Sequence, residues 1–280
     1  MLPEFSSVMV GTREEAIHAL QDRPGAVLVA GGTDLLVRMR KGEVHDHLVD
    51  VSRVPELSVV NDEDGRLCIG ACVTHSAVSR DARIIGRAQS LAVACGCVGS
   101  PQIRNMGTIG GNLVNASPAA DSIPPLLVHD SCVQVEGPAG TRRESLATFI
   151  VAPYKTLISA TEMLSSIVIE PLTGYAEGYR RVARRAALAI SRLSVAWAIK
   201  EEDKRFEDVR LAIGSCTPMP FRPKSVEEFL KGQIRAKIVA EEAVRMVLEE
   251  IRAATGERPS YVYKLPVVRD LLLAILGGGP

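Results

Sequence analysis

The sequence has few aromatic residues, no excess of either charge and no long apolar run. Only 4% of its 280 residues are aromatic whereas 46% are hydrophobic, so the core must consist mainly of aliphatic side chains. Lys and Arg together number 33, as do Asp and Glu. This balance removes the usual electrostatic case for a nucleic-acid partner. No run reaches the roughly 18 apolar residues of a membrane span, so none is expected.

The sequence also lacks a recognisable catalytic or metal-binding group. Its six cysteines are too few for a disulfide framework in a chain of this length, and their spacing is not that of zinc or iron–sulfur ligands. We find no Ser-His-Asp set and no paired carboxylates, so we assign no catalytic residue and no metal site. The first residues have neither the basic start nor the apolar stretch of a signal peptide, and we expect a cytoplasmic protein.

Length and changes in composition predict two domains, residues 1–173 and 174–280. The first third alternates short apolar strands with helices, and the capping box of Thr12 and Glu15 predicts a helix over 13–21. The many glycines and prolines between Gly99 and Pro125 predict a long ordered loop, a feature that is usually functional.

Further elements follow from hydrophobic patterns. We expect a buried helix over 88–97 and a terminal helix over 266–276. A second capping box, Ser225 with Glu228, should open a helix whose apolar positions continue to Ile251. Five strands are predicted, at 132–136, 164–169, 179–185, 194–199 and 209–214.

The first glycine-rich segment is Val29-Ala30-Gly31-Gly32-Thr33-Asp34-Leu35. It fits neither the Rossmann pattern nor the P-loop pattern. An apolar strand that stops at two glycines nevertheless has a physical use, because glycine lets backbone N–H groups approach an anion closely. Asp34 can cap the short helix that follows. A tight turn that binds nothing explains the segment as well.

The second segment, residues 103–112, holds three glycines, two asparagines and one threonine but no acidic side chain. A site built from amides, hydroxyls and glycine backbone suits a diphosphate that needs neutral donors. The alternative is an elaborate loop that satisfies its own hydrogen bonds.

Together with several other short motifs, the two glycine-rich segments resemble those of a known protein family. The chain is similar to the FAD-binding subunit of the molybdenum hydroxylases, the family that includes the medium subunit of aerobic carbon monoxide dehydrogenase and the flavin part of xanthine dehydrogenase. The matching pieces occur in the family's order: Ala30-Gly31-Gly32-Thr33-Asp34-Leu35, Ile69-Gly70-Ala71-Cys72-Val73-Thr74-His75, Ile103-Arg104-Asn105-x-Gly107-Thr108-Ile109-Gly110-Gly111-Asn112, Ser117-Pro118-x-x-Asp121 and Gly214-Ser215-Cys216-Thr217-Pro218.

The resemblance implies an α+β fold. Its FAD-binding domain is of the vanillyl-alcohol-oxidase (PCMH) type, with two α/β subdomains at about 1–53 and 54–173. A smaller C-terminal α+β domain of the carbon monoxide dehydrogenase flavoprotein type follows at 174–280. FAD would lie between the two subdomains, and both glycine segments would hold its pyrophosphate through backbone amides.

The same resemblance implies the site residues. Asp121 matches an acidic residue that contacts the adenosine part, although a helix cap is an alternative. Leu164 matches an apolar contact, although a core leucine explains it equally well, and Arg180 stands where the family often has a lysine. His75 is expected to start a helix and is given no chemistry. The implied cofactor-binding set is Val29, Ala30, Gly31, Gly32, Thr33, Asp34, Leu35, Gly107, Thr108, Ile109, Gly110, Gly111, Asn112, Ser117, Asp121, Leu164 and Arg180.

By resemblance, substrate is hydroxylated at a molybdenum cofactor on a large partner subunit. Electrons then pass through two 2Fe–2S centres on a small partner subunit to FAD on this chain, and from FAD to a terminal acceptor. Two alternatives stay open: a free-standing flavoprotein oxidoreductase of the same FAD fold, and a nucleotide-binding protein without redox function.

Overall fold

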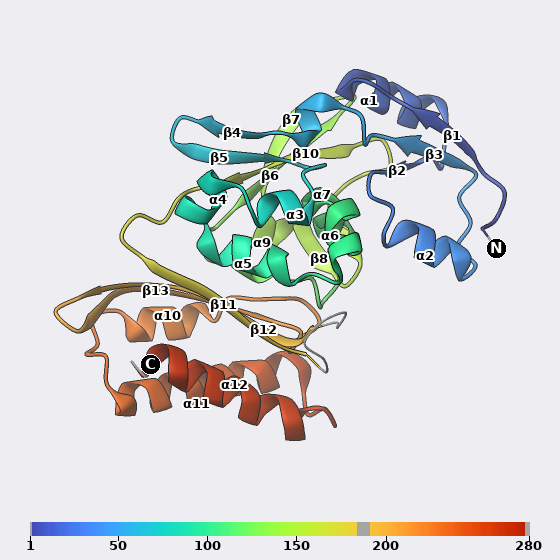
Figure 1. The fold of residues 1–280 in the computed structure, drawn as a ribbon. Helices are drawn as coiled ribbons and strands as arrows, with labels where there is room; N and C mark the ends of the chain where they lie inside the picture. The colour runs from blue at the N-terminus through green and yellow to red at the C-terminus, as the bar shows by residue number, and fades with distance from the viewer. Residues whose placement is uncertain (1, 184–190, 278–280) are drawn as a thin grey trace.

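The computed structural model describes residues 2–183 and 191–277 (Figure 1). Its N-terminal unit is a three-stranded parallel sheet in the order β1 (Ser6–Met9), β3 (His47–Asp50), β2 (Val27–Val29). Helices α1 (Arg13–Asp22) and α2 (Leu35–Arg40) connect these strands, as parallel pairing requires. The hydroxyl of Thr12 accepts a hydrogen bond from the Glu15 amide at 3.1 Å, which confirms the predicted start of α1.

A five-stranded antiparallel sheet follows, and helices cover one of its faces. Its strands, in spatial order, are β4 (Val60–Glu63), β5 (Arg66–Gly70), β10 (Met163–Ile169), β6 (Cys132–Gly137) and β7 (Gly140–Ser145). The first helices on it are α3 (His75–Val78), α4 (Ala82–Arg87) and α5 (Gln89–Cys97), and the last of these confirms the predicted buried helix. The smaller elements are η1 (Pro55–Ser58), α9 (Leu146–Phe149), β8 (Ile150–Ala152) and β9 (Lys155–Thr156).

The long loop expected between Gly99 and Pro125 is wrong. The segment instead forms three short helices, α6 (Pro101–Met106), α7 (Ile109–Asn115) and α8 (Ile123–Val128). Ser100 and Thr108 cap the first two with their hydroxyls, and prolines stand at the first turns of α6 and α8. The glycines and prolines therefore mark helix boundaries, where they are tolerated, and were misread as a loop.

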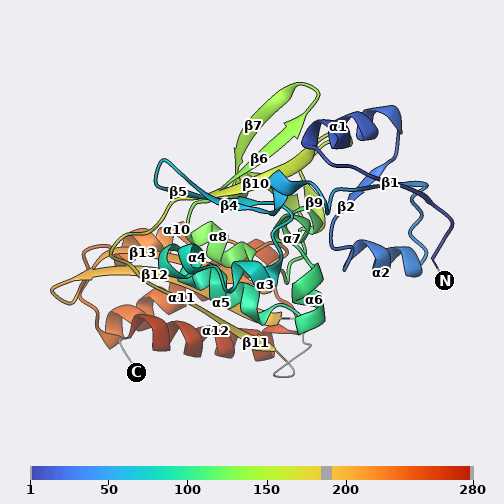
Figure 2. The same cartoon turned by 45° about the horizontal axis from the view of Figure 1, so that its top comes forward.

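The C-terminal part packs a second sheet against the same helices (Figure 2). Strands β11 (Ala176–Ala183), β12 (Ser191–Glu202) and β13 (Arg205–Gly214) form an antiparallel meander. Along β12, small residues such as Ala196 and Ala198 belong to the core shared with α5 and α8, whereas Val195 and Ile199 pack toward the C-terminal helices. The strand predicted at 179–185 corresponds to the end of β11, and its residues 184–185 lie outside the described residues.

Three helices cover the far face of this sheet, α10 (Lys224–Leu230), α11 (Lys237–Thr255) and α12 (Tyr261–Leu276). The second capping box is wrong, because α10 begins after Pro223 and the Ser225 hydroxyl contacts Glu250 instead. The apolar period does not form one helix, since Gly232 adopts φ +77° in the break between α10 and α11. Helix α12 begins five residues before Pro266, which lies inside it.

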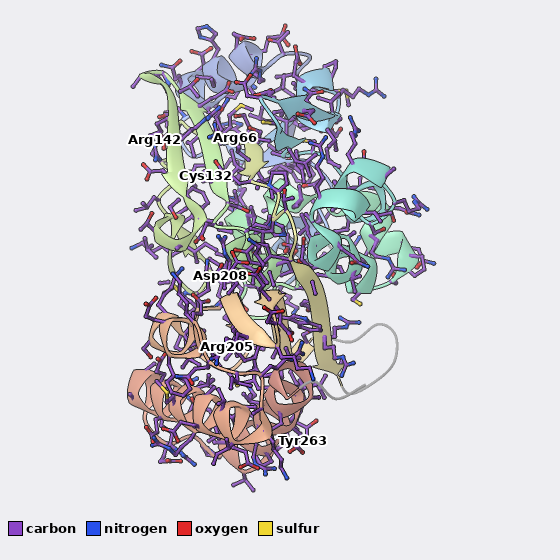
Figure 3. The ribbon with its side chains drawn as sticks, turned by 90° about the vertical axis from the view of Figure 1, so that its left-hand side faces the viewer. Arg66, Cys132, Arg142, Arg205, Asp208 and Tyr263 are labelled. Carbon is purple, nitrogen blue, oxygen red and sulfur yellow. The ribbon has the colours of Figure 1, made fainter. Side chains whose placement is uncertain are left out.

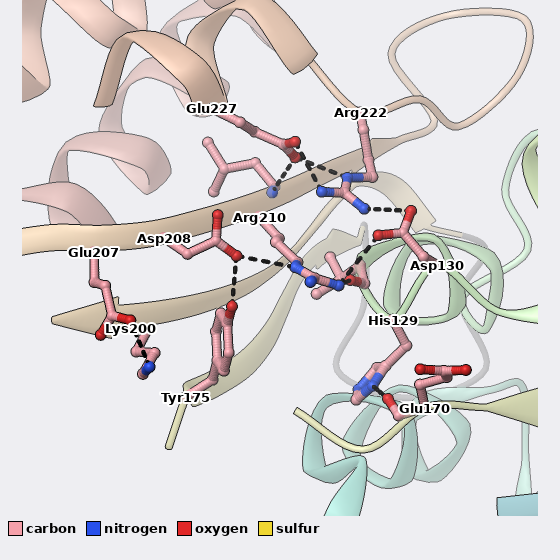
Figure 4. A network of polar contacts seen from close by, with 12 residues as sticks. His129, Asp130, Glu170, Tyr175, Lys200, Glu207, Asp208, Arg210, Arg222 and Glu227 are labelled. Carbon is pink, nitrogen blue, oxygen red and sulfur yellow. Dashed lines mark hydrogen bonds and ion pairs between the residues drawn. The ribbon is translucent and has the colours of Figure 1, made fainter. Parts of the chain in front are cut away.

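Arginines join the two parts of the chain (Figure 4). Asp130, in the turn between α8 and β6, accepts hydrogen bonds from Arg210 at 3.1 Å and from Arg222 at 2.7 Å. Arg222 also pairs with Glu227, whose carboxylate accepts the Leu211 amide. Figure 3 shows this junction from the side, with Cys132 on the upper sheet and Asp208 on the lower one. We propose that the domain boundary falls near residue 173, between β10 and β11.

No helix among residues 2–183 and 191–277 combines the length and apolar character needed to cross a membrane.

Candidate functional site

A cavity of about 610 Å³ lies between the parallel sheet and the helix-covered face of the five-stranded sheet. Its volume falls in the ordinary range of small-molecule sites. Residues of β2 and α2 line one side of it and residues of α6 and α7 the other. Figures 1 and 2 show where these four elements lie in the fold. Thirteen of the predicted site residues line it: Val29, Ala30, Gly31, Gly32, Thr33, Asp34, Leu35, Gly107, Thr108, Gly110, Gly111, Asn112 and Leu164.

The two glycine segments touch where Gly31 meets the peptide after Met106. A Cβ added to Gly31 would lie 1.8 Å from the Met106 carbonyl oxygen, so no larger residue fits without moving the backbone. Gly32 adopts φ +65°, a conformation that glycine reaches without strain. The sequence thus encodes a close approach of two backbones at the wall of the cavity.

The first segment leaves a run of backbone donors unused. Among the described residues, the amides of residues 31–35 have no hydrogen-bond acceptor, although Leu36 and Arg38 already donate within the first turns of α2. Asp34 is exposed and makes no side-chain cap. Consecutive free N–H groups beside a glycine turn form the kind of nest that binds an anion.

The second segment is different, because most of its amides are already used. Ile109 donates to the Val73 carbonyl and Gly110 to the Ala71 carbonyl, each at 2.9 Å. The Gly111 amide donates to the Thr108 hydroxyl at 3.1 Å. A Cβ on Gly110 would lie 2.5 Å from that of Ala71. These glycines therefore allow α7 to pack tightly behind the cavity.

The cavity lining includes residues that the sequence reasoning did not assign to the site, and three of them are Arg38, Tyr154 and His75. Arg38 donates to Glu43 at 2.8 Å and to Asn115 on α7 at 2.5 Å, so it bridges the two sides of the cavity. Its place one turn after Asp34 was an available signal. Tyr154 lines the cavity with φ +60° and a largely exposed ring, and no sequence pattern pointed to it.

The third missed residue, His75, is the first residue of α3, as predicted, but it also lines the cavity. Burial lowers the pKa of its imidazole to about 4, and the nearby charge of Arg104 acts in the same direction. The ring is therefore neutral near pH 7.

Four predicted site residues do not line the cavity. Ile109 is fully buried in the core, and the Ser117 hydroxyl accepts the Ala119 amide at 3.3 Å. Arg180 is exposed on β11, and the arginine that reaches the interior is its neighbour Arg181. The alternation of side chains along a strand explains this difference of one residue. Asp121 is the fourth.

Asp121 lies in a buried polar network. Its carboxylate accepts hydrogen bonds from the hydroxyls of Tyr179 and Ser191, each at 2.5 Å, and pairs with Arg181 at 3.1 Å. Burial and the charge of Asp121 raise the pKa of Tyr179 well above its usual value, so the phenol stays protonated and donates. In this structure Asp121 joins the first part of the chain to β11 and β12.

Comparison with family models gives two matches that together cover nearly the whole chain. Residues 3–172 match the FAD binding domain in molybdopterin dehydrogenase. Residues 178–277 match the carbon monoxide dehydrogenase flavoprotein C-terminal domain.

Individual proteins agree with these matches. The FAD-binding subunit of xanthine dehydrogenase from Escherichia coli is 28% identical, with 95% of this chain and 92% of that protein covered. The medium chain of glyceraldehyde dehydrogenase from Sulfolobus acidocaldarius is 30% identical, with 97% and 96% covered. A chain of carbon monoxide dehydrogenase from Hydrogenophaga pseudoflava superposes with a TM-score of 0.90 at 23% identity, with 100% and 96% covered. This structural likeness confirms the expected α+β fold with a PCMH-type FAD-binding domain.

Proposed function

The chain belongs to the family of FAD-binding subunits of the molybdenum hydroxylases, and we propose that it passes electrons from iron–sulfur centres of a partner subunit through FAD to a terminal acceptor. FAD is the cofactor of this family and supplies the redox chemistry when bound. The contribution of the chain itself is to bind, orient and shield the cofactor.

One observation supports the proposed position of FAD: within the part of the chain that the structure describes, the amides of residues 31–35 have no acceptor, and they lie at the wall of a cavity lined by both glycine segments. A diphosphate oxygen satisfies such amides, which otherwise have only water as a partner. Arg38 brings a positive charge to the same cavity. We propose that the first segment supplies the anion-binding amides and that the second shapes the wall. Its Thr108 amide, which has no acceptor among residues 2–183 and 191–277, can add one donor.

Apolar residues suit the flavin ring. Leu28, Ile158, Met163 and Leu164 line the cavity beside the polar segments. Ligand sites commonly combine an apolar lining with a few polar groups that fix orientation. We propose that Leu164 contacts the cofactor, as the resemblance implies. Ser117, Asp121 and Arg180 are not among the residues that line the cavity, so their contacts with the cofactor stay predictions.

Several relatives are named as medium chains or FAD subunits, and such chains belong to complexes of several subunits. We propose that the partners of this chain are a large subunit with the molybdenum cofactor and a small subunit with 2Fe–2S centres. Relatives named for xanthine and for glyceraldehyde resemble this chain almost equally, which supports a substrate choice made by the large subunit. The cytoplasmic location stays a prediction.

Purification of the tagged chain from its source tests this function. We expect two further chains to be retained, together with molybdenum and iron. Oxidisable substrate should then bleach the flavin band near about 450 nm only in the complex. If the isolated chain hydroxylated a substrate without partners, the proposed role as an electron-transfer subunit would be wrong.

A further inference from the structure

His75 is held against both glycine segments. Its amide donates to the Gly107 carbonyl at 3.0 Å, and the residue before it, Thr74, forms a β-bridge with Thr108. The Thr74 hydroxyl caps α3 by accepting the Ala77 amide. The backbone that carries the imidazole is therefore fixed relative to the wall of the cavity.

The ring edge that contains Nε2 faces the junction of the two segments. An added Cβ on Gly107 would lie 3.4 Å from Cδ2 of His75, the carbon bonded to Nε2, and 3.2 Å from the hydroxyl oxygen of Thr33. His75 is 2% exposed and lines the cavity. Among the described residues, Nε2 has no hydrogen-bond partner, so this polar atom is available to a ligand.

The other ring nitrogen is already engaged. Nδ1 lies 3.5 Å from Sγ of Cys95, which is completely buried on α5. Burial raises the pKa of the Cys95 thiol, so its sulfur keeps its proton. A thiol that donates to Nδ1 leaves the single proton of a neutral imidazole on Nε2.

We propose that His75 is a neutral hydrogen-bond donor to the diphosphate of the bound dinucleotide, with Nε2–H directed at the junction of the glycine segments and with Cys95 fixing the tautomer. This inference rests on the proposed binding of FAD and adds a side-chain donor to the amides of residues 31–35. Thr33, whose hydroxyl converges on the same point, lies beside it.

A neutral donor at residue 75 predicts a different pH dependence of diphosphate affinity from that of a cationic histidine. Burial and the neighbouring charge of Arg104 lower the pKa of His75 to about 4. The affinity for a diphosphate should therefore not rise through protonation of this residue between pH about 8 and about 5. A solvent-exposed histidine would titrate within that range.

Two variants separate the two ring positions. In His75→Gln the amide nitrogen can occupy the place of Nε2, whereas in His75→Asn it reaches only the place of Nδ1. We expect His75→Asn to weaken binding of FAD and of ADP by about 10- to 100-fold, the effect of losing one hydrogen bond to a charged group. His75→Gln should stay within about threefold of wild type. His18→Gln, on the exposed face of α1, is the matched control.

Probe choice makes the result specific. Riboflavin has no diphosphate, so His75→Asn should leave its binding unchanged. Equal losses for riboflavin and ADP, or equal behaviour of the Asn and Gln variants, would overturn the inference. If wild type and His75→Asn bind FAD with equal affinity, this inference is wrong but the proposed function stands. If the wild-type chain binds neither FAD nor ADP, the proposed function is wrong.

The tautomer can be measured without any substitution. Nitrogen-15 NMR of the flavin-free wild-type chain at pH 7 should show His75 neutral, with the proton on Nε2. A proton on Nδ1 alone, or a doubly protonated ring, contradicts the proposal even where a variant fails to fold.

Discussion

Nε2 of His129 lies 3.0 Å from Oε2 of Glu177, and both side chains are buried where α5 and α8 meet β11. Nδ1 of the same ring lies 3.1 Å from the Glu170 carbonyl oxygen (Figure 4). The Ser90 hydroxyl also donates to Glu177, at 2.8 Å. Each ring nitrogen of His129 therefore faces an oxygen atom of a different residue. This pair joins the two parts of the chain through their shared core.

The pair predicts how stability depends on pH. Burial alone would raise the pKa of Glu177, but His129 and Ser90 outweigh it, so the pKa lies below its usual value of 4.5. The ionised group therefore adds stability that is present above about pH 5 and is lost as the pH falls through the folded-state pKa. We expect the unfolding free energy of wild type to exceed that of Glu177→Gln by about 1–3 kcal/mol at neutral pH.

Denaturant unfolding at a series of pH values measures this difference. The gap between wild type and Glu177→Gln should narrow as the pH falls below about 4. Glu207→Gln, which breaks an exposed pair with Lys200, is the control and should cost less than about 1 kcal/mol. Parallel curves for wild type and Glu177→Gln would show that this pair contributes nothing pH-dependent.

Gly31 and Gly86 form a second matched test. Gly31→Ala places a methyl group against the Met106 carbonyl, whereas a Cβ on Gly86 in α4 meets nothing within 4 Å. We expect Gly31→Ala to lower FAD affinity by at least about 10-fold and to destabilise the chain by about 1–3 kcal/mol. Gly86→Ala should be neutral or stabilising by up to about 1 kcal/mol. Titration of FAD fluorescence and thermal unfolding provide the two readouts. An unchanged FAD affinity in Gly31→Ala would show that this turn does not contact the cofactor.

Substitutions of Asp121 test whether this residue has a structural role or makes the adenosine contact that the resemblance implies. Asp121→Ala leaves Arg181 and two buried hydroxyls without their shared acceptor. We expect a loss of about 3–5 kcal/mol in unfolding free energy. Asp121→Asn should lower the melting temperature but leave ADP affinity unchanged, as measured by calorimetry. A lower ADP affinity in a folded Asp121→Asn protein would instead support the predicted contact between Asp121 and the adenosine part.

Arg38 tests the electrostatic part of the site. Arg38→Met removes the bridge to Asn115 and a positive charge at the cavity. We expect the affinity for ADP to fall by roughly 5- to 10-fold and to depend less on salt. Arg40→Met, which changes an exposed residue of the same helix outside the cavity lining, should bind as wild type does. Equal effects of the two substitutions would show only a general loss of charge.

Local signals predicted much of the fold. The capping box at Thr12, the buried helix at 88–97 and the strands around Cys132 and Leu164 all carry their information in adjacent residues. The segment from Gly99 to Pro125 was misread because the same glycines and prolines that interrupt helices also begin them. Sequence spacing does not show that Ser100 and Thr108 would cap short helices against a shared core.

The motifs predicted which two segments of the chain come together at one cavity. Gly31 through Leu35 and Gly107 through Asn112 converge on one cavity, apart from the buried Ile109. The sequence did not show which amides of the second segment are already hydrogen-bonded. Their acceptors, the carbonyls of Ala71 and Val73, lie in the segment that follows β5, far from residues 107–112 in the sequence. Arg180 was named because it stands where the family often has a lysine; which of Arg180 and Arg181 faces the interior depends on the pairing of β11 with β12, which no local pattern reveals.

The most direct test of the central claim, that the cavity between the two glycine segments binds FAD, is the visible spectrum of the purified chain after incubation with FAD and gel filtration. We predict bands near about 370 and about 450 nm that stay with the protein in wild type and in Gly86→Ala but are lost from Gly31→Ala. A folded wild-type chain that emerges colourless would contradict the account, and so would a Gly31→Ala chain that keeps the full spectrum.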